Sequence, residues 1–306
     1  MRIVAFYHID KAGGASVFEW FKVQRAEFFH YGDARCFYWL PQHRDLFIKR
    51  EDLARGPSVH CTELLRRVGN TSLVYLEYHA HVKYQFWDRL LPQAAELRRR
   101  HELFLTFTFV REPLSHLLSF YGMWPGRHEL SLEQWLAGSV ARGQQTRQLA
   151  VQHWGLAAEG CNTSLALTRL RSVDMACTLR WMHRCLARIA AVLARPFFVE
   201  DVPHVKPVGS QSYSSSVVVQ RAGTVPYSLL YQAAECDQRL FDREQEWAYP
   251  RSDAPRGDEW LAVMPNSSAA AAWLLRSAPV RRPRPGTRES HSRTLRSVAP
   301  SLVPHT

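Results

Sequence analysis

The sequence predicts an α/β protein with a central parallel sheet flanked by helices. Short apolar segments alternate along the chain with segments of helical periodicity, and one of them, residues 104–110, is apolar almost throughout. Alternation of this kind favours a parallel sheet covered by helices on both faces. A continuous apolar strand is typical of the interior of such a sheet. The chain has 306 residues, 46% of them hydrophobic, which excludes wholesale disorder.

The predicted strands are short and rich in β-branched and aromatic residues; they cover residues 2–9, 72–79, 104–110 and 197–200. The predicted helices follow the 3.6-residue period; they cover residues 16–27, 112–121, 173–193 and 227–247. The helix over 112–121 has a proline in its first turn, where proline is tolerated. These elements predict one domain over residues 1–250.

Residues 251–306 are rich in proline, serine and arginine, and we expect a basic, disordered tail there. The whole chain carries a formal net charge of +11, from 39 basic and 28 acidic residues. A basic chain favours polyanionic partners. Only five of the 39 basic residues are lysine, so a lysine in a motif is informative, although the arginine excess could also reflect genome composition.

No segment approaches the roughly 18 consecutive apolar residues that span a bilayer. The first residues, MRIVAFYHID, lack a basic leader, a long apolar region and a small-residue cleavage site, so they do not form a signal peptide. The sequence leaves two expectations open: a cytosolic protein, or one whose targeting segment lies outside this sequence.

A glycine-containing loop follows the first predicted strand. The segment HIDKAGGAS holds Lys11, Gly13, Gly14, Ala15 and Ser16 and opens the first predicted helix. Glycines allow close approach of backbone N–H groups to an anion, and a helix N-terminus attracts negative charge. This pattern predicts phosphate binding, and an ordinary strand-to-helix turn is the alternative. The loop differs from the P-loop GxxxxGK[ST], because its lysine precedes the glycines.

A second candidate anion site follows the strand over residues 104–110. Arg111 stands at the strand end and can hold a phosphate through two hydrogen bonds, and Ser119 lies two helical turns further on. In the alternative, Arg111 pairs with Glu112 and Ser119 is an ordinary helix residue. Two anion sites after two strands of one sheet predict a ligand with two phosphate-like ends.

Two histidines follow one another at the end of the second predicted strand, in the sequence YHAHV. Residues two apart in a strand face the same side, so His79 and His81 could share a cleft. Imidazole accepts a proton near neutral pH. The alternatives are a pair of surface or core histidines and a metal site. No close Cys, His or carboxylate spacing completes a ligand set, so the sequence predicts no metal.

These motifs resemble those of the PAPS-dependent carbohydrate sulfotransferases over residues 1–250. HIDKAGGAS is similar to their 5′-phosphosulfate loop HxPKTxGTS, and FVREPLSHLLSFY to their 3′-phosphate element VRDPxxRxxSxY. The resemblance implies a P-loop-like nucleotide-binding architecture. It also implies that PAPS is held by Lys11, Gly13, Gly14, Ala15, Ser16, Arg111 and Ser119.

The chain departs from the family pattern at four positions. Ala12 and Ala15 replace threonines and His116 replaces a common arginine. Asp10 replaces a proline and brings a negative charge beside the expected phosphates, so its carboxylate must point away for the cofactor to bind.

The segment that contains the histidine pair resembles one branch of the family in particular. HAHVKYQFWD is similar to the HGHVxFxxF segment of the heparan sulfate and uronyl 2-O-sulfotransferases. This similarity implies that His81 is the general base, that His79 supports it and that Lys11 stabilises the departing phosphate. The implied reaction is in-line transfer of a sulfuryl group to the 2-O position of a uronic acid, without a metal. The expected partner is therefore an acidic glycan and not nucleic acid.

The segment Gln144 to Arg147 is similar to a QTR segment of these enzymes. The resemblance implies that Gln145 and Arg147 lie near the acidic sugar, whereas a solvated loop arginine is the alternative. The residues from Asp237 to Phe241 and the helix after them resemble the terminal helix of the family, which implies a structural role only.

The six cysteines show no CxxC spacing, which argues against zinc ribbons and thioredoxin chemistry. Cys177 and Cys185 fall eight residues apart on one predicted helix, about 12 Å by helical rise, so we expect them not to bond each other. Cys161 with either of them is the better candidate. Sequons begin at Asn70, Asn162 and Asn266. With the family resemblance they imply a Golgi lumenal glycoprotein, a type II membrane protein whose anchor lies upstream of this sequence.

Three other functions compete with this one. The first is a sulfotransferase for another acceptor, such as a galactose-containing glycan or a small hydroxyl compound. The second is a nucleotide kinase of related architecture, against which the missing Walker loop counts. The third is a catalytically inactive protein that binds polyanions, which the altered loop at Asp10, Ala12 and Ala15 favours.

Overall fold

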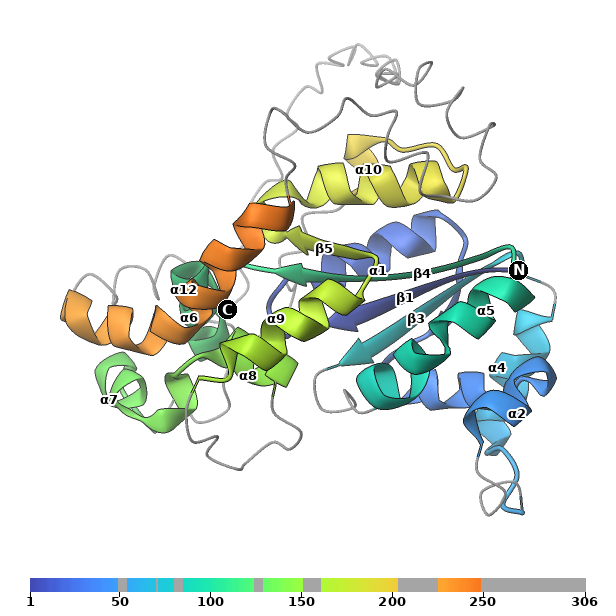
Figure 1. Cartoon of the computed structure of the whole chain (residues 1–306), viewed down its shortest axis with the longest axis horizontal. Helices are drawn as coiled ribbons and strands as arrows, with labels where there is room; N and C mark the ends of the chain where they lie inside the picture. The colour runs from blue at the N-terminus through green and yellow to red at the C-terminus, as the bar shows by residue number, and fades with distance from the viewer. Residues whose placement is uncertain are drawn as a thin grey trace, which may run out of the picture.

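The computed structural model describes residues 1–48, 54–69, 71–79, 85–123, 129–150, 161–202 and 225–248. Within them, five parallel strands form one sheet in the order β2-β3-β1-β4-β5. The strands are β1 (Arg2–His8), β2 (Glu27–Phe29), β3 (Leu73–His79), β4 (Leu103–Val110) and β5 (Met175–Thr178). The predicted α/β class with a central parallel sheet flanked by helices is confirmed (Figure 1).

The helices cover both faces of the sheet (Figure 1). α5 and α9 lie across the face turned to the viewer, and α1 lies behind the strands. The α-helices are α1 (Gly14–Val23), α2 (Arg44–Phe47), α4 (Val59–Val68), α5 (Ala94–Arg100), α6 (Pro113–Met123), α7 (Leu132–Ala137), α8 (Gln144–Ala150), α9 (Thr163–Ser172), α10 (Met182–Val192) and α12 (Tyr227–Ala248). Short 3₁₀ turns and one π-helical turn connect them, at Tyr31–Trp39, Pro41–His43, Gln85–Leu90, Leu91–Gln93, Ser139–Ala141, Leu179–Trp181 and Val199–Asp201.

The main core consists of aromatic side chains on the two faces of the sheet. On the face under α1, Phe21 stacks on Tyr75 at 4.4 Å between ring centroids, and Phe6 stacks on Phe107 at 4.7 Å. On the other face, Tyr7 packs against Trp87 at 4.8 Å. Neighbouring residues of β1 thus point to opposite faces, which explains why the interior of this strand, Ile3 to Tyr7, is apolar.

A second, smaller core lies at the end of the sheet where the strands finish (Figure 1). It joins α6, α7 and α12, with the Tyr121 ring 5.2 Å from the Trp135 ring and Leu230 packed beside them. α7 begins with a reciprocal cap, because Ser131 accepts the N–H of Gln134 and the Gln134 side chain accepts the N–H of Ser131. This core places the start of α6 beside the carboxyl end of β4.

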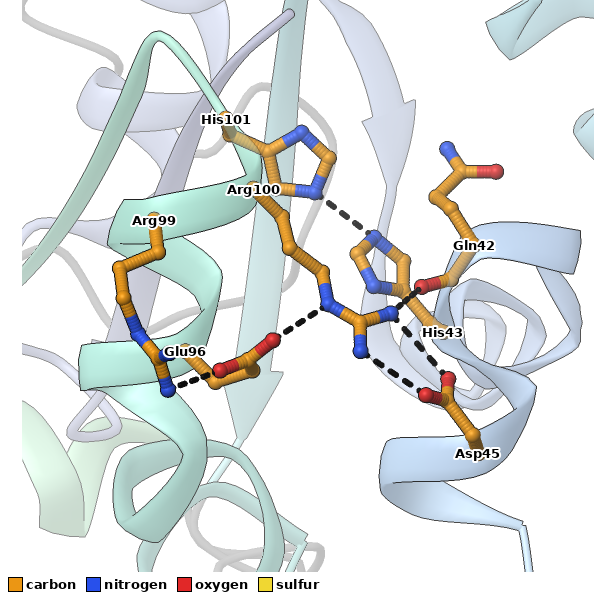
Figure 2. A network of polar contacts seen from close by, with 7 residues as sticks. All are labelled: Gln42, His43, Asp45, Glu96, Arg99, Arg100 and His101. Carbon is orange, nitrogen blue, oxygen red and sulfur yellow. Dashed lines mark hydrogen bonds and ion pairs between the residues drawn. The ribbon is translucent and has the colours of Figure 1, made fainter.

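At the opposite end, α5 is tied to α2 and to the turn before it by a polar network (Figure 2). The Arg100 guanidinium donates to Asp45 Oδ2 at 2.8 Å and to Glu96 Oε1 at 2.6 Å. Behind it, His101 Nε2 lies 3.0 Å from Nε2 of the fully buried His43. His43 Nδ1 is buried and has no hydrogen-bond partner within the part of the chain that the structure describes.

Several predicted elements are wrong in type or extent. The helix expected over 173–193 is a strand, β5, followed by a turn and α10. β5 pairs with the end of β4, and this pairing overrides the helical composition of the segment. The strand expected over 197–200 is wrong, because a 3₁₀ turn covers Val199–Asp201. The first helix ends at Val23, and β2 follows where the helix was expected to continue.

The expected cysteine pairing is also wrong. Cys177 and Cys185 form a disulfide with their Cα atoms 6.3 Å apart, because Cys177 lies in β5 and not on the helix of Cys185. Cys161 is bonded to Cys236, across 75 residues of chain, and Cys36 is bonded to Cys61.

The expected tail over residues 251–306 lies outside the described residues. Among the helices of the described part, none has both the length and the hydropathy needed to cross a membrane.

Candidate functional site

The carboxyl ends of β1 and β4 form the switch point of the sheet. The chain leaves β1 toward β2 on one side and leaves β4 toward β5 on the other, so the two connections diverge. Ligands of open parallel sheets bind in the crevice at such a point. Both predicted anion loops begin here, at Lys11 and at Arg111.

The loop after β1 has an unusual backbone. Lys11 has φ 65° and Gly13 has φ 91°, both in the left-handed region, which is rare for a lysine and is often found at functional sites. A Cβ at Gly13 would lie 2.4 Å from Met182 Cε, and one at Gly14 would lie 2.0 Å from Cε1 of His8. Both glycines are therefore needed for close packing as well as for the turn.

The N-terminus of α1 has no side-chain cap. Ser16 is half-buried in the first turn, Ala15 is exposed beside it, and the Ser16 N–H donates to the Gly13 carbonyl at 3.1 Å. The first N–H groups of a helix have no partner within the helix. This end of α1 can therefore accept an anion.

Arg111 reaches across to this loop. Its Nη1 donates to the carbonyl of Lys11 at 3.1 Å and its Nε donates to Ser115 Oγ at 2.8 Å. Glu112, the alternative partner, instead accepts the backbone N–H groups of Leu114 and Ser115 at the start of α6. Within the described residues no carboxylate forms an ion pair with Arg111 or with Lys11.

Arg111 therefore lies against the backbone of Lys11, and neither cation has an ion-pair partner among the described residues. Burial lowers the pKa of the Lys11 ammonium, and the Arg111 charge lowers it further, against a smaller opposing effect of Asp10. Burial also lowers the pKa of the Arg111 guanidinium. Two half-buried cations that disfavour each other are stabilised by a bound anion.

α8 holds both loops by their backbones. Gln145 Oε1 accepts the N–H of Arg111 at 2.7 Å, and its Nε2 donates to the Arg111 carbonyl at 2.8 Å. Gln148 Oε1 accepts the N–H of Asp10 at 2.7 Å. Gln145 is fully buried, so the structure places it under the anion loop and in contact with Arg111. Arg147 faces the other way and donates to the Ser139 carbonyl at 3.0 Å.

α8 is itself anchored to α12 by a buried carboxylate. Asp237 accepts the backbone N–H groups of Gln145 and Thr146 at 3.1 and 2.8 Å and the Thr146 hydroxyl at 2.9 Å. Burial raises its pKa to about 6, although these hydrogen bonds oppose the shift. The role is structural, as the sequence suggested for this helix.

On the α1 side of the sheet the ends of β1 and β3 carry a cluster of histidines and carboxylates. Asp10 Oδ1 lies 3.5 Å from His79 Nδ1, and Glu77 Oε1 lies 3.2 Å from His79 Nε2 and 2.7 Å from His8 Nδ1. The Asp10 carboxylate must point away from the expected phosphates if PAPS is to bind. In the structure this carboxylate is paired with His79. His116, also at a changed position, is buried and donates Nε2–H to the Asp10 carbonyl at 2.7 Å.

The charges in this cluster depend on each other. Burial alone would lower the pKa of His79, but the hydrogen bonds to Asp10 and Glu77 outweigh it and raise the pKa to about 9. Burial alone would raise the pKa of Asp10, but the hydrogen bond from His79 holds it below its ordinary value. At neutral pH His79 is thus a cation and does not itself accept a proton.

The predicted site residues fall into three groups. Lys11, Gly13, Gly14, Arg111 and Gln145 come together at the switch point, with His79 on the neighbouring strand end. Ser119 lies further along α6, half-buried, and Arg147 turns away on α8. His81 lies outside the described residues.

Sequence reasoning missed four residues that complete the site, namely His8, Glu77, Ser115 and Gln148, and it did not predict that Asp237 anchors α8. Two of them carried a signal. Glu77 is a charged residue within a strand that is otherwise apolar and aromatic up to the histidine, and Ser115 follows Arg111 at the helical spacing of four. The other partners are brought in from distant parts of the chain.

We compared the chain with protein-family models, with curated proteins and with solved structures, and none of the three comparisons found a match.

Proposed function

We propose that this protein is a PAPS-dependent sulfotransferase that transfers a sulfuryl group to a hydroxyl of an acidic glycan, at the 2-O position of a uronic acid. The observation that carries the proposal is the meeting of Lys11 and Arg111. The two residues come from motifs 100 positions apart and touch at the switch point, through the 3.1 Å hydrogen bond from Arg111 to the Lys11 carbonyl.

A nucleotide with two phosphate-like ends suits this arrangement. The uncapped start of α1 and the Lys11 ammonium offer one anion site, and the Arg111 guanidinium offers a second. Both cations lack a carboxylate partner in the described part of the chain, so an anionic ligand supplies their missing charge. The negative charge of Asp10 repels an anionic ligand less than its position in the loop suggests, because its carboxylate is paired with His79.

The chemistry proposed is a direct displacement. His81 takes the proton of the sugar hydroxyl, the hydroxyl oxygen forms a bond to sulfur, and the bond from sulfur to the 5′-phosphate oxygen breaks. Lys11 stabilises the charge that develops on the departing phosphate. The cationic His79 contributes positive charge near the reacting groups, and Gln145 holds the Arg111 backbone in place. No step of this reaction requires a metal ion.

The cysteines favour the proposed location, the Golgi lumen. All six are paired in the structure, and stable disulfides are typical of oxidising compartments. Asn162, in one of the three sequons, is exposed at the start of α9 and accessible to glycosylation. A type II membrane orientation remains part of the proposal from the family resemblance.

The first experiment is a calorimetric titration of the full chain with 3′-phosphoadenosine 5′-phosphate. We expect micromolar binding that Lys11→Ala and Arg111→Ala each weaken at least tenfold. The matched controls are Lys22→Ala and Arg66→Ala, which remove exposed cations paired with Glu19 and Glu63 and should leave the affinity unchanged. Absence of binding by folded protein would overturn the assignment.

The second experiment separates the enzyme from an inactive polyanion-binding protein. Sulfate transfer from labelled PAPS to a uronic-acid glycan should occur in the wild type and be lost in His81→Ala, with nucleotide affinity unchanged. Transfer to galactose-containing glycans alone would show that the acceptor is such a glycan and not a uronic acid. Nucleotide and glycan binding without any transfer would refute the catalytic proposal.

A further inference from the structure

Three ligand-type atoms meet at the ends of β1 and β3. His8 Nδ1 lies 2.7 Å from Glu77 Oε1 and 3.1 Å from His79 Nε2, and the third side of the triangle, from His79 Nε2 to Glu77 Oε1, is 3.2 Å. The sheet register produces this arrangement. Glu77 and His79 are two apart on β3 and share a face, and His8 pairs with His79 on the neighbouring strand.

Hydrogen bonds account for at most two of the three contacts. Each of the two ring nitrogens can carry at most one proton, and the carboxylate oxygen supplies none. If both nitrogens carry protons, both N–H groups donate to the one oxygen and the two nitrogens face each other at 3.1 Å without a bond. If only one does, the lone pair of the other nitrogen faces the carboxylate oxygen.

A cation shared by the three atoms accounts for all three contacts at once. Zinc binds histidine nitrogen at about 2.0–2.1 Å and carboxylate oxygen at about 2.0–2.2 Å, so tetrahedral ligand atoms lie about 3.3 Å apart. Two of the separations, 3.1 and 3.2 Å, need to expand by only about 0.1–0.2 Å to reach this spacing. The 2.7 Å contact of His8 with Glu77 must open by about 0.6 Å.

The outer partners of such a site are already in place. His79 directs its other nitrogen, Nδ1, to the Asp10 carboxylate at 3.5 Å, the arrangement in which a carboxylate orients a metal-binding histidine. Glu77 directs its other oxygen, Oε2, to His30 Nε2 at 2.9 Å. The side chains of His8, Glu77 and His79 are 12%, 1% and 15% exposed, so they are held by packing.

We propose that His8 Nδ1, Glu77 Oε1 and His79 Nε2 bind one divalent transition-metal cation of the zinc class. Two imidazoles and one carboxylate suit Zn²⁺ or Co²⁺ and disfavour Mg²⁺ and Ca²⁺, which prefer oxygen ligands. Three protein ligands leave the fourth tetrahedral position open. The sequence predicted no metal because no local spacing completes a ligand set; in the structure His8 supplies the third ligand from another strand.

This site does not depend on the proposed sulfotransferase function. The transfer reaction needs no metal, and the test below measures binding alone. A failure of nucleotide binding would leave the metal site intact, and a failure of metal binding would leave the nucleotide site intact.

The experiment is a titration of metal-free, untagged full-length protein with Co²⁺, followed by its visible absorption and by competition with Zn²⁺. We expect one Co²⁺ per chain with an intense four-coordinate spectrum that Zn²⁺ abolishes and Mg²⁺ does not. His8→Ala, His79→Ala and Glu77→Gln should each weaken binding by about 100-fold or more, since even outer-shell changes cost roughly 10–100-fold. The matched control His60→Ala removes an exposed histidine outside the cluster and should bind as the wild type does.

A second measurement covers the case in which the ligand variants fail to fold. In the wild type, Zn²⁺ should shift the imidazole ¹⁵N resonances of two histidines, one through Nδ1 and one through Nε2, and should raise the unfolding temperature. No Co²⁺ spectrum from folded wild-type protein would overturn the proposal. So would a spectrum that persists unchanged in folded His8→Ala and His79→Ala, because the metal would then be bound elsewhere.

Discussion

Acid should destabilise this protein through His43, whose surroundings exclude a positive charge. The ring is fully buried between Phe37 and Phe47. One nitrogen faces His101 (Figure 2), and the other has no partner among the described residues. Burial lowers its pKa from 6.5 to about 3, with smaller contributions in the same direction from the charges of His101 and Arg100.

The sign and size of this pH dependence follow from the difference in proton binding between the folded and unfolded states. Between pH 6.5 and 3 the unfolded chain binds a proton at His43 that the folded protein does not, so the free energy of unfolding falls as the pH falls. From pH 7.5 to pH 5.0 the loss is about 2 kcal/mol, at 1.36 kcal/mol for each pH unit below 6.5. This magnitude depends only on the unfolded pKa, because at pH 5.0 the folded group is still neutral.

The assay is urea unfolding at pH 7.5 and 5.0 of the wild type and of His43→Phe, a change that keeps an aromatic ring beside Phe37 and Phe47 and removes the titration. The variant should lose about 2 kcal/mol less than the wild type between the two pH values. His60→Ala, at an exposed histidine, should behave as the wild type does. Equal losses in His43→Phe and the wild type would refute the reasoning.

Three further predictions concern the supports of the site. Removing the Cys161–Cys236 disulfide by a double alanine substitution should lower the free energy of unfolding by about 4 kcal/mol, because it closes a loop of 75 residues; urea unfolding measures this. Gly13→Ala should cost about 1–3 kcal/mol in the same assay and weaken nucleotide binding, because φ is 91° and the new Cβ would meet Met182. Gln145→Leu should cost about 2–4 kcal/mol and reduce nucleotide affinity, because the N–H and C=O of Arg111 lose their buried partner.

The first two of these predictions have a matched control. Removing Cys177–Cys185, which closes only eight residues, should cost about 2–3 kcal/mol, and a larger loss than for Cys161–Cys236 would contradict the loop argument. Gly69→Ala places its Cβ 3.5 Å from the nearest atom at an ordinary φ and should be nearly neutral. If Gln145→Leu leaves both stability and nucleotide affinity unchanged, the Arg111 backbone does not depend on α8.

Long elements with a clear local pattern were predictable and short ones were not. β1, β3 and β4 are buried on both faces, and their apolar segments show this directly. β2 and β5 have three and four residues, too few for a pattern, and they exist because a neighbouring strand offers its edge. The error in β5 then produced the error in the pairing of Cys177, since a strand and a helix place that residue at different distances from Cys185.

The candidate site divides in the same way. The two anion loops are local motifs, and the sequence placed Lys11 and Arg111 at strand ends, where the structure has them. The supporting role of α8 and Asp237 was not predicted. The QTR segment was expected beside the acidic sugar, and nothing in the pattern of either helix indicates that one holds the other. Their roles appear only when α12 brings Asp237 under the start of α8.

By itself, the sequence determined the three long strands β1, β3 and β4, the interior character of β4, and the residue types of the two anion loops, because these depend on neighbours in the chain. Only the tertiary structure decided the strand order, the contact of Lys11 with Arg111, and the meeting of His8 with Glu77 and His79. The physical reason is that each of these depends on pairing between strands far apart in sequence, which no local periodicity encodes.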